Sequence, residues 1–260
     1  MRERLGLGRL LPLGGARDGA WIAERAAREV LLDAARGVAG VRPGDLRVGL
    51  ADPEDTGEPA VPQPPGALPP GPLRVTADFT AVVGGVAAGA EPLPAAAGRL
   101  RAVLAEAATE RLGLTVTDVD LRATGLRATG TGTGTDTDSG PEHDRDRDAG
   151  REPREAGPRD EEEAARADAV DRDGDEGRVA TAALGVAGVA RLAGVLGRPV
   201  HLTESPAEGA LPRRHVRVEL AVAADHRAVE VARRVRSAVS EALPDRPSVS
   251  VVVTAVSWPA

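Results

Sequence analysis

The pentapeptide GVAGV occurs twice in this chain, at residues 37–41 and again at 185–189, 148 positions apart. Each copy directly follows an alanine-rich stretch with helical character and precedes residues with the apolar alternation of a strand. Because five identical small residues recur in the same local setting, we expect one structural unit to be present twice. This duplication constrains the fold more than any other feature of the sequence.

The rest of each unit supports the duplication. Residues 73–82 and 216–225 both alternate as half-buried strands do, and residues 99–121 align with 234–256 without a gap. Apolar residues between 228 and 242 recur at helical spacing, with Pro244 placed to end the helix. We therefore predict an α+β fold of two small modules, each with a short, mostly antiparallel sheet packed against helices on one face and joined by a disordered linker.

A repetitive acidic segment separates the two units. Residues 131–177 hold 17 acidic residues and 7 arginines, a net charge of −10, whereas the rest of the chain sums to +3. A segment with so little to bury cannot recover its ordering entropy, so we expect it to be disordered. The predicted division is an N-terminal tail (1–19), a first module (20–126) with a proline-rich loop (52–72), a disordered acidic linker (127–175) and a second module (176–258).

The glycines of the two pentapeptides are predicted to be structural. We expect Gly37 and Gly185 to end their helices with positive φ, and Gly40 and Gly188 to turn the chain toward the sheet.

No residue pattern indicates catalysis, a cofactor or a metal. The chain has no cysteine, which excludes disulfides, thiolate chemistry and cysteine-ligated metals. The run DRDGDEG (171–177) fails as a calcium loop, since Glu176 stands where glycine is needed. The histidines do not share metal-ligand spacing: His143 lies in the acidic linker, and ordinary surface positions are expected for His201, His215 and His226. We therefore expect a protein that is not an enzyme.

Apolar runs are too short for a membrane span, and the N-terminus lacks a convincing secretory signal. We therefore expect a cytoplasmic location.

Arginines on and near the helix at 228–242 form the one candidate binding face. They lie off its apolar stripe and could contact an anion or a partner: Arg213, Arg214, Arg227, Arg233, Arg234 and Arg236. Against a nucleic-acid partner stand Glu230 and Glu241 on the same face, the acidic net charge and the lack of stacking aromatics. A solvated outer helix face is the favoured interpretation, and an anionic partner remains the alternative.

The order of elements resembles that of the bacterial alkaline-shock, or envelope-stress-response, protein family, in two degenerate copies of a high-GC actinobacterial type. The resemblance is carried by WIAERAAREVLLDAARGVAGV (21–41) with RVTADFTAV (74–82), and by RVATAALGVAGVARL (178–192) with HVRVELAVAADHRAVEVARRVRSAVSEAL (215–243). It departs from the family in having two modules, a proline-rich insert in the first and a shortened first helix in the second.

The resemblance implies a small, non-enzymatic cytoplasmic protein that binds other proteins. Its implied partners include single-module relatives and a membrane-anchoring protein that would hold it at the membrane. The family supplies no catalytic residue to this chain.

Overall fold

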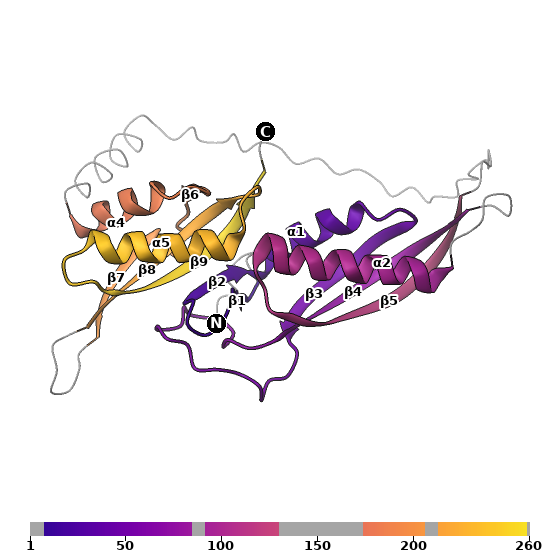
Figure 1. The fold of residues 1–260 in the computed structure, drawn as a ribbon, viewed down its shortest axis with the longest axis horizontal. Helices are drawn as coiled ribbons and strands as arrows, with labels where there is room; N and C mark the ends of the chain where they lie inside the picture. The colour runs from indigo at the N-terminus through magenta and orange to yellow at the C-terminus, as the bar shows by residue number, and fades with distance from the viewer. Residues whose placement is uncertain (1–7, 85–91, 130–173, 206–212, 259–260) are drawn as a thin grey trace, which may run out of the picture.

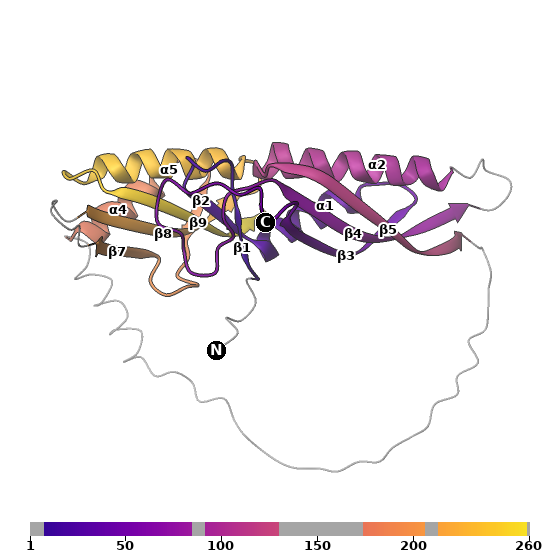
Figure 2. The same ribbon diagram turned by 90° about the horizontal axis from the view of Figure 1, so that it is seen from below.

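The computed structural model describes residues 8–84, 92–129, 174–205 and 213–258. Its elements form two sheets with helices along one side (Figures 1 and 2). The strands are β1 (Leu10–Pro12), β2 (Ala20–Ala23), β3 (Val41–Leu50), β4 (Leu73–Gly84), β5 (Val116–Thr129), β6 (Val189–Leu192), β7 (Val200–Ser205), β8 (Arg213–Ala223) and β9 (Ser248–Ser257). The helices are α1 (Glu24–Arg36), α2 (Leu93–Glu106), the π-helical turn η1 (Ala107–Leu112), α4 (Asp175–Leu184) and α5 (Ala228–Ala242).

The predicted α+β class is confirmed, and the same order of elements occurs twice. In the first module α1 leads to β3, β4, α2 and β5; in the second α4 leads to β6 and β7, then β8, α5 and β9. The central strand of each sheet pairs antiparallel with the strand before it and parallel with the strand after its helix. A helical crossover returns the chain in the same direction, so both sheets are mixed.

The two pentapeptides occupy equivalent positions in the modules. The same backbone hydrogen bonds form in both copies: Val38 N–H to Ala35 O and Val186 N–H to Ala183 O; Val41 N–H to Val38 O and Val189 N–H to Val186 O; Val82 N–H to Gly40 O and Ala223 N–H to Gly188 O. Each turn thus joins the end of a helix to the central strand of its sheet.

The predicted roles of the four glycines need one correction. Gly37 and Gly185 end their helices in the right-handed region, with φ of −72° and −71°. The left-handed residue is the second glycine of each copy, Gly40 at φ 75° and Gly188 at φ 96°. The cap residues Gly37 and Gly185 therefore keep right-handed backbone angles, and the reversal occurs at Gly40 and Gly188, where only glycine adopts the angle without strain.

The gapless alignment of residues 99–121 with 234–256 holds in the helix and fails in the strand. Thr124 and Thr254 each stand at the bulge of the last strand and donate to a carbonyl of the central strand, at 3.2 Å in both cases. These equivalent threonines are 130 positions apart, whereas the first residues of α2 and α5 are 135 apart. Between the start of the helix and the bulge, the first module is therefore longer than the second, and its additional residues lie around η1. Alternation alone could not locate them.

The N-terminal segment belongs to the sheet of the second module. β2 pairs parallel with β9, joining Ala20 to Val251, and β1 pairs antiparallel with β2. The assignment of residues 1–19 to a tail and of 20–126 to the first module is therefore wrong for β1 and β2, which belong to the sheet of the second module. The helix before the first pentapeptide begins at Glu24, because the residues that precede it add a strand to a free sheet edge.

The proline-rich loop (52–72) packs beside this added edge. Leu68 donates its N–H to Leu10 O at 2.8 Å, and the indole N–H of buried Trp21 donates to Leu68 O at 3.1 Å. The loop thereby covers the outer strand β1, which would otherwise present unpaired backbone groups to solvent. The predicted acidic linker lies outside the described residues except at its ends, where β5 extends to Thr129 and α4 begins at Asp175.

The two modules contact each other directly, with α5 and α2 end to end in Figure 2. We call the part of a module that carries the GVAGV turn, the start of its long helix and the end of its last strand the pentapeptide end. The pentapeptide end of the second module meets η1 and α1 of the first, where Val229 packs on Gly113 and Gly14. A Cβ on Gly113, whose φ is 84°, would lie 2.1 Å from Val229 Cγ1.

Replacing Gly113 with alanine should therefore destabilise the protein. The new methyl group both strains a left-handed residue and forces Val229 away, and we expect a loss of about 2–4 kcal/mol in the free energy of unfolding. Urea unfolding followed by circular dichroism measures it. Gly98→Ala is the matched control, since its Cβ meets nothing within 4 Å and a helical alanine adds up to about 1 kcal/mol. Equal stability of the two variants would refute the packing described for the module contact.

Candidate functional site

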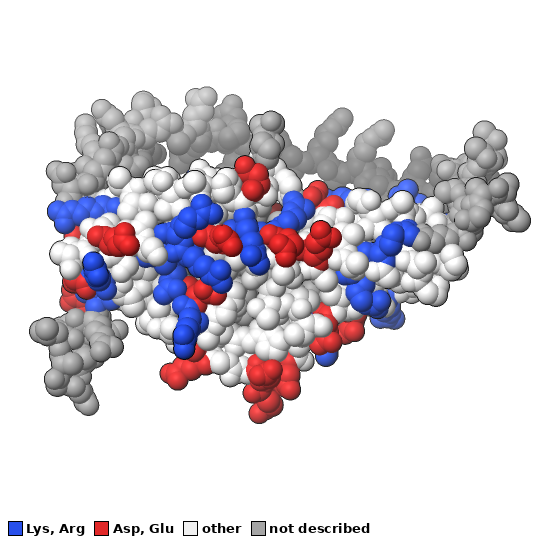
Figure 3. All heavy atoms as spheres, viewed as in Figure 1, with Lys and Arg blue, Asp and Glu red and all other residues white. Residues whose placement is uncertain are grey.

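The arginines predicted to form a binding face mostly bind other parts of the chain. Figure 3 shows arginines over α5 interspersed with carboxylates rather than as a patch of one sign. The guanidinium groups reach the N-terminal segment, the first module or neighbouring elements of the second. Each pairing lowers the charge available to an external partner.

Arg233 and Arg236 hold the loop before β2 against α5. Arg233 donates to both oxygens of Asp18, at 2.8 and 3.0 Å. Arg236 donates to three backbone carbonyls, those of Arg17, Asp18 and Val249. The hydrogen bonds from Arg233 hold the pKa of Asp18 below its ordinary value, and Asp18 raises the pKa of Arg233. Burial lowers the pKa of Arg236. We call this contact the Asp18 clamp.

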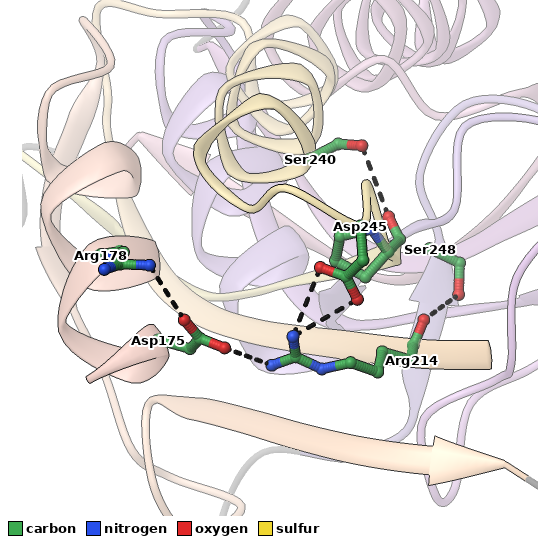
Figure 4. A network of polar contacts seen from close by, with 7 residues as sticks. Asp175, Arg178, Arg214, Ser240, Asp245 and Ser248 are labelled. Atoms are coloured by element: carbon green, nitrogen blue, oxygen red, sulfur yellow. Dashed lines mark hydrogen bonds and ion pairs between the residues drawn. The ribbon is translucent and has the colours of Figure 1, made fainter. Parts of the chain in front are cut away.

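Arg227 and Arg214 make further internal bonds. Arg227 donates to Thr109 O at 3.1 Å and so joins the start of α5 to η1 of the first module. Arg214 lies between Asp175, at 2.7 Å, and Asp245, at 3.3 Å (Figure 4). The hydrogen bond to Asp175 raises the pKa of Arg214. These contacts tie β8 to the start of α4 and to the turn after α5.

The remaining two predicted arginines, Arg234 and Arg213, lie on α5 and at the start of β8. Arg234 is exposed on α5 and makes no hydrogen bond or ion pair with any described residue. Arg213 begins β8, opposite Ser205, and its side chain lies outside the described part of the structure. The six arginines therefore do not form one continuous free face.

His215 is buried, contrary to the expectation of a surface position. Its Nδ1 lies 2.9 Å from Ser248 Oγ and its Nε2 lies 2.9 Å from Ser250 Oγ, both on the neighbouring strand β9. The side chain is 7% exposed, and burial, reinforced by the positive charge of Arg217, lowers the pKa of His215 to about 4. The imidazole is thus neutral at physiological pH, with both nitrogens engaged.

Glu219 lies on the same face of β8 and is fully buried. Its Oε2 accepts the N–H of Leu196 at 2.7 Å, and its Oε1 lies 3.4 Å from Arg217 Nε. The carboxylate therefore fixes the loop between β6 and β7 over the sheet. Sequence alternation did not single out Glu219, because a half-buried strand is expected to place its polar residues in solvent.

The described residues contain no cluster of three or more His, Asp or Glu side chains that could hold a metal ion. In the former calcium-loop candidate, Asp175 and Glu176 form the first turn of α4, so the spacing of a loop is not kept there. His201 lies on β7 and His226 contacts Asp225, while His143 lies outside the described residues.

The pentapeptide end of the first module carries an apolar hollow. It has a volume of about 170 Å³, and its lining residues come from the turn, the ends of β4 and β5 and the start of α2: Ala39, Gly40, Ala81, Val82, Leu93, Ala96, Arg99 and Leu126. Leu93 is 38% exposed and Leu126 is 68% exposed, and both border the hollow. Arg99 donates to Ala39 O at the rim.

The equivalent residues of the second module are covered. Ala228 begins α5 as Leu93 begins α2, and Val256 stands two residues past the bulge threonine of its strand, as Leu126 does. Ala228 is 1% exposed, and both residues line the narrow space against Val30 and Leu112 of the first module. The pentapeptide end of the second module is thus docked against the first module. The described residues leave the pentapeptide end of the first module open.

Comparison with known proteins adds no assignment: no protein-family model, curated protein or solved structure matches the chain. Among the described residues, no helix has the length and apolar character needed to cross a membrane.

Loss of the Asp18 carboxylate should weaken the attachment of the N-terminal segment. Because Arg233 is half exposed, we expect Asp18→Asn to cost only about 1 kcal/mol of unfolding free energy at pH 7. The folded-state pKa of Asp18 is lowered, so this contribution is present at neutral pH and is lost as the pH falls through that lowered value. Urea unfolding at pH 7 tests it. Asp45→Asn, which removes exposed ion pairs within the first module, should change stability by less than about 0.5 kcal/mol.

His215 should make stability fall with acidification. Its pKa is about 4 in the folded protein and 6.5 ordinarily, so the unfolded chain binds the proton more readily between these values. The contribution is intact above pH 6.5 and declines by about 3 kcal/mol as the pH falls to 4. Unfolding free energies at pH 7, 6, 5 and 4 should show a shallower slope in His215→Gln. An unchanged slope would show that burial of this imidazole is not linked to folding.

Proposed function

We propose that this protein is a non-enzymatic scaffold or adaptor of the alkaline-shock, envelope-stress type. It acts in the cytoplasm, binds other proteins, and reaches the inner face of the membrane through an anchoring partner. The observation that carries the proposal is the difference between the two pentapeptide ends. In the second module this end binds another module, and in the first the corresponding leucines are exposed.

The internal contact supplies the physical precedent for such binding. Small and branched apolar side chains of the second module face Val30 and Leu112, and Arg227 adds a bond to a backbone carbonyl. At the open end, Leu93 and Leu126 offer larger apolar surface beside a hollow. Exposed apolar side chains that border a concave surface are typical of protein–protein contacts.

The contact between modules also changes how the scaffold would present its binding surface. A flexible linker would let two independent domains engage partners at raised effective concentration. Here the β2–β9 pairing and the Asp18 clamp place the modules in one arrangement. The scaffold we propose therefore offers one open end in a defined orientation rather than two freely moving domains.

The nucleic-acid alternative has less support. Arg214, Arg227, Arg233 and Arg236 are all bound to groups of the chain itself, and only Arg234 of the described members is without such a bond. Affinity for a polyanion grows with the number of arginines that can neutralise phosphates. The protein-binding proposal is therefore preferred.

A photo-crosslinking amino acid at position 126, in cells that naturally make the protein, tests the proposal. We expect it to capture a distinct partner protein, and Leu93→Asp in the same chain should reduce the yield at least tenfold by placing a charge in the apolar contact. The matched control is position 195, because Val195 is 50% exposed but lies away from the pentapeptide ends. Equal capture from both positions, or capture that Leu93→Asp does not affect, would count against docking at this end.

A further inference from the structure

A second hollow lies along the outer side of α5. Its volume is about 460 Å³, and it is lined by one stripe of the helix and by the turn that follows it: Arg233, Arg236, Ser237, Ser240, Glu241 and Arg246. Three guanidinium groups and two hydroxyls therefore border a space with a single carboxylate. This hollow is separate from the apolar one at the first module and uses none of its residues.

Two of the arginines are held in place by the N-terminal segment. Arg233 keeps its bidentate contact with Asp18, and Arg236 bonds only to backbone carbonyls among its described hydrogen-bond partners. A carbonyl positions a guanidinium but does not cancel its charge. Burial lowers the pKa of Arg236, as expected for a partly desolvated cation. The Asp18 clamp thus positions Arg236 with its charge uncancelled, whereas Arg233 is paired with a carboxylate.

Arg246 completes the hollow from the turn after α5. It is the one described residue other than glycine with a positive φ, 44°. A left-handed backbone angle is unfavourable for a residue with a side chain, and such residues concentrate at functional positions. Arg246 is exposed and forms no ion pair or side-chain hydrogen bond with the described residues. Its guanidinium is therefore available to a ligand.

We infer that this hollow binds a phosphate monoester, with Arg246 as the ligand-facing cation beside the positioned Arg233 and Arg236 and the hydroxyl of Ser237. Guanidinium groups match phosphate oxygens in charge and in hydrogen-bond geometry. Because Asp18 pairs with Arg233, the positive charge that faces the ligand comes from Arg236 and Arg246, with Glu241 as the carboxylate on the rim. The hollow is open to solvent, so the phosphate can belong to a larger molecule. This site is independent of the docking end in the proposed function.

Titration of the full chain with inorganic phosphate, followed by NMR of the arginine Nε–H signals, tests the site. We expect saturable shifts at the arginines of the hollow, and at least tenfold weaker binding in Arg246→Ala. The matched control is Arg234→Ala, which removes an equally exposed arginine of α5 that does not line the hollow. Binding that both variants weaken equally, or neither weakens, would overturn the inference, because it would reflect general attraction or none.

Glu241→Gln provides a test in which phosphate binding should become tighter rather than weaker. Its carboxylate borders the hollow, so removing that charge should tighten phosphate binding by a few-fold, and unchanged or weaker binding would contradict the inference.

Discussion

The pairing of β2 with β9 is the interaction on which the arrangement of the molecule depends. It takes four residues from the start of the chain and places them in the sheet of the second module, although more than two hundred residues separate the strands. Backbone hydrogen bonds set the register, and the bidentate contact of Arg233 with Asp18 fixes the preceding loop on α5. The proline-rich loop then covers the new edge of the sheet through Trp21. Each of these contacts presupposes the strand pairing.

This interlocking gives different surroundings to two modules of the same build. The contact between them is of the head-to-tail type, in which one surface of a module meets a different surface of its neighbour. A head-to-tail pair necessarily leaves one copy of each surface unused. In this chain the unused pentapeptide end carries Leu93 and Leu126, whereas the used one carries the smaller Ala228 and the half-buried Val256. The larger side chains thus stand at the exposed end and the smaller ones at the covered end.

The arginines of α5 show how far residue type can predict a site. Helical spacing correctly placed Arg233, Arg234 and Arg236 off the apolar stripe, since Val231, Val235 and Val239 are all buried. It could not show that Asp18, 215 residues from Arg233, would accept its hydrogen bonds. It also did not single out Arg246, which is distinguished by its backbone angle and by the hollow that it borders. Composition therefore predicted cations on the helix but not which of them would be free.

The sequence by itself determined the α+β class, the duplication and the position of both GVAGV turns, because periodicity and glycine placement act through nearby residues. The tertiary structure decided that β2 joins the distant sheet, that the π-helical turn shifts the alignment of β5 with β9, and that His215 is buried between two serines. Those outcomes depend on which surfaces meet in space. A sheet edge accepts any strand of suitable length and register, so alternation identifies a strand without identifying its partner.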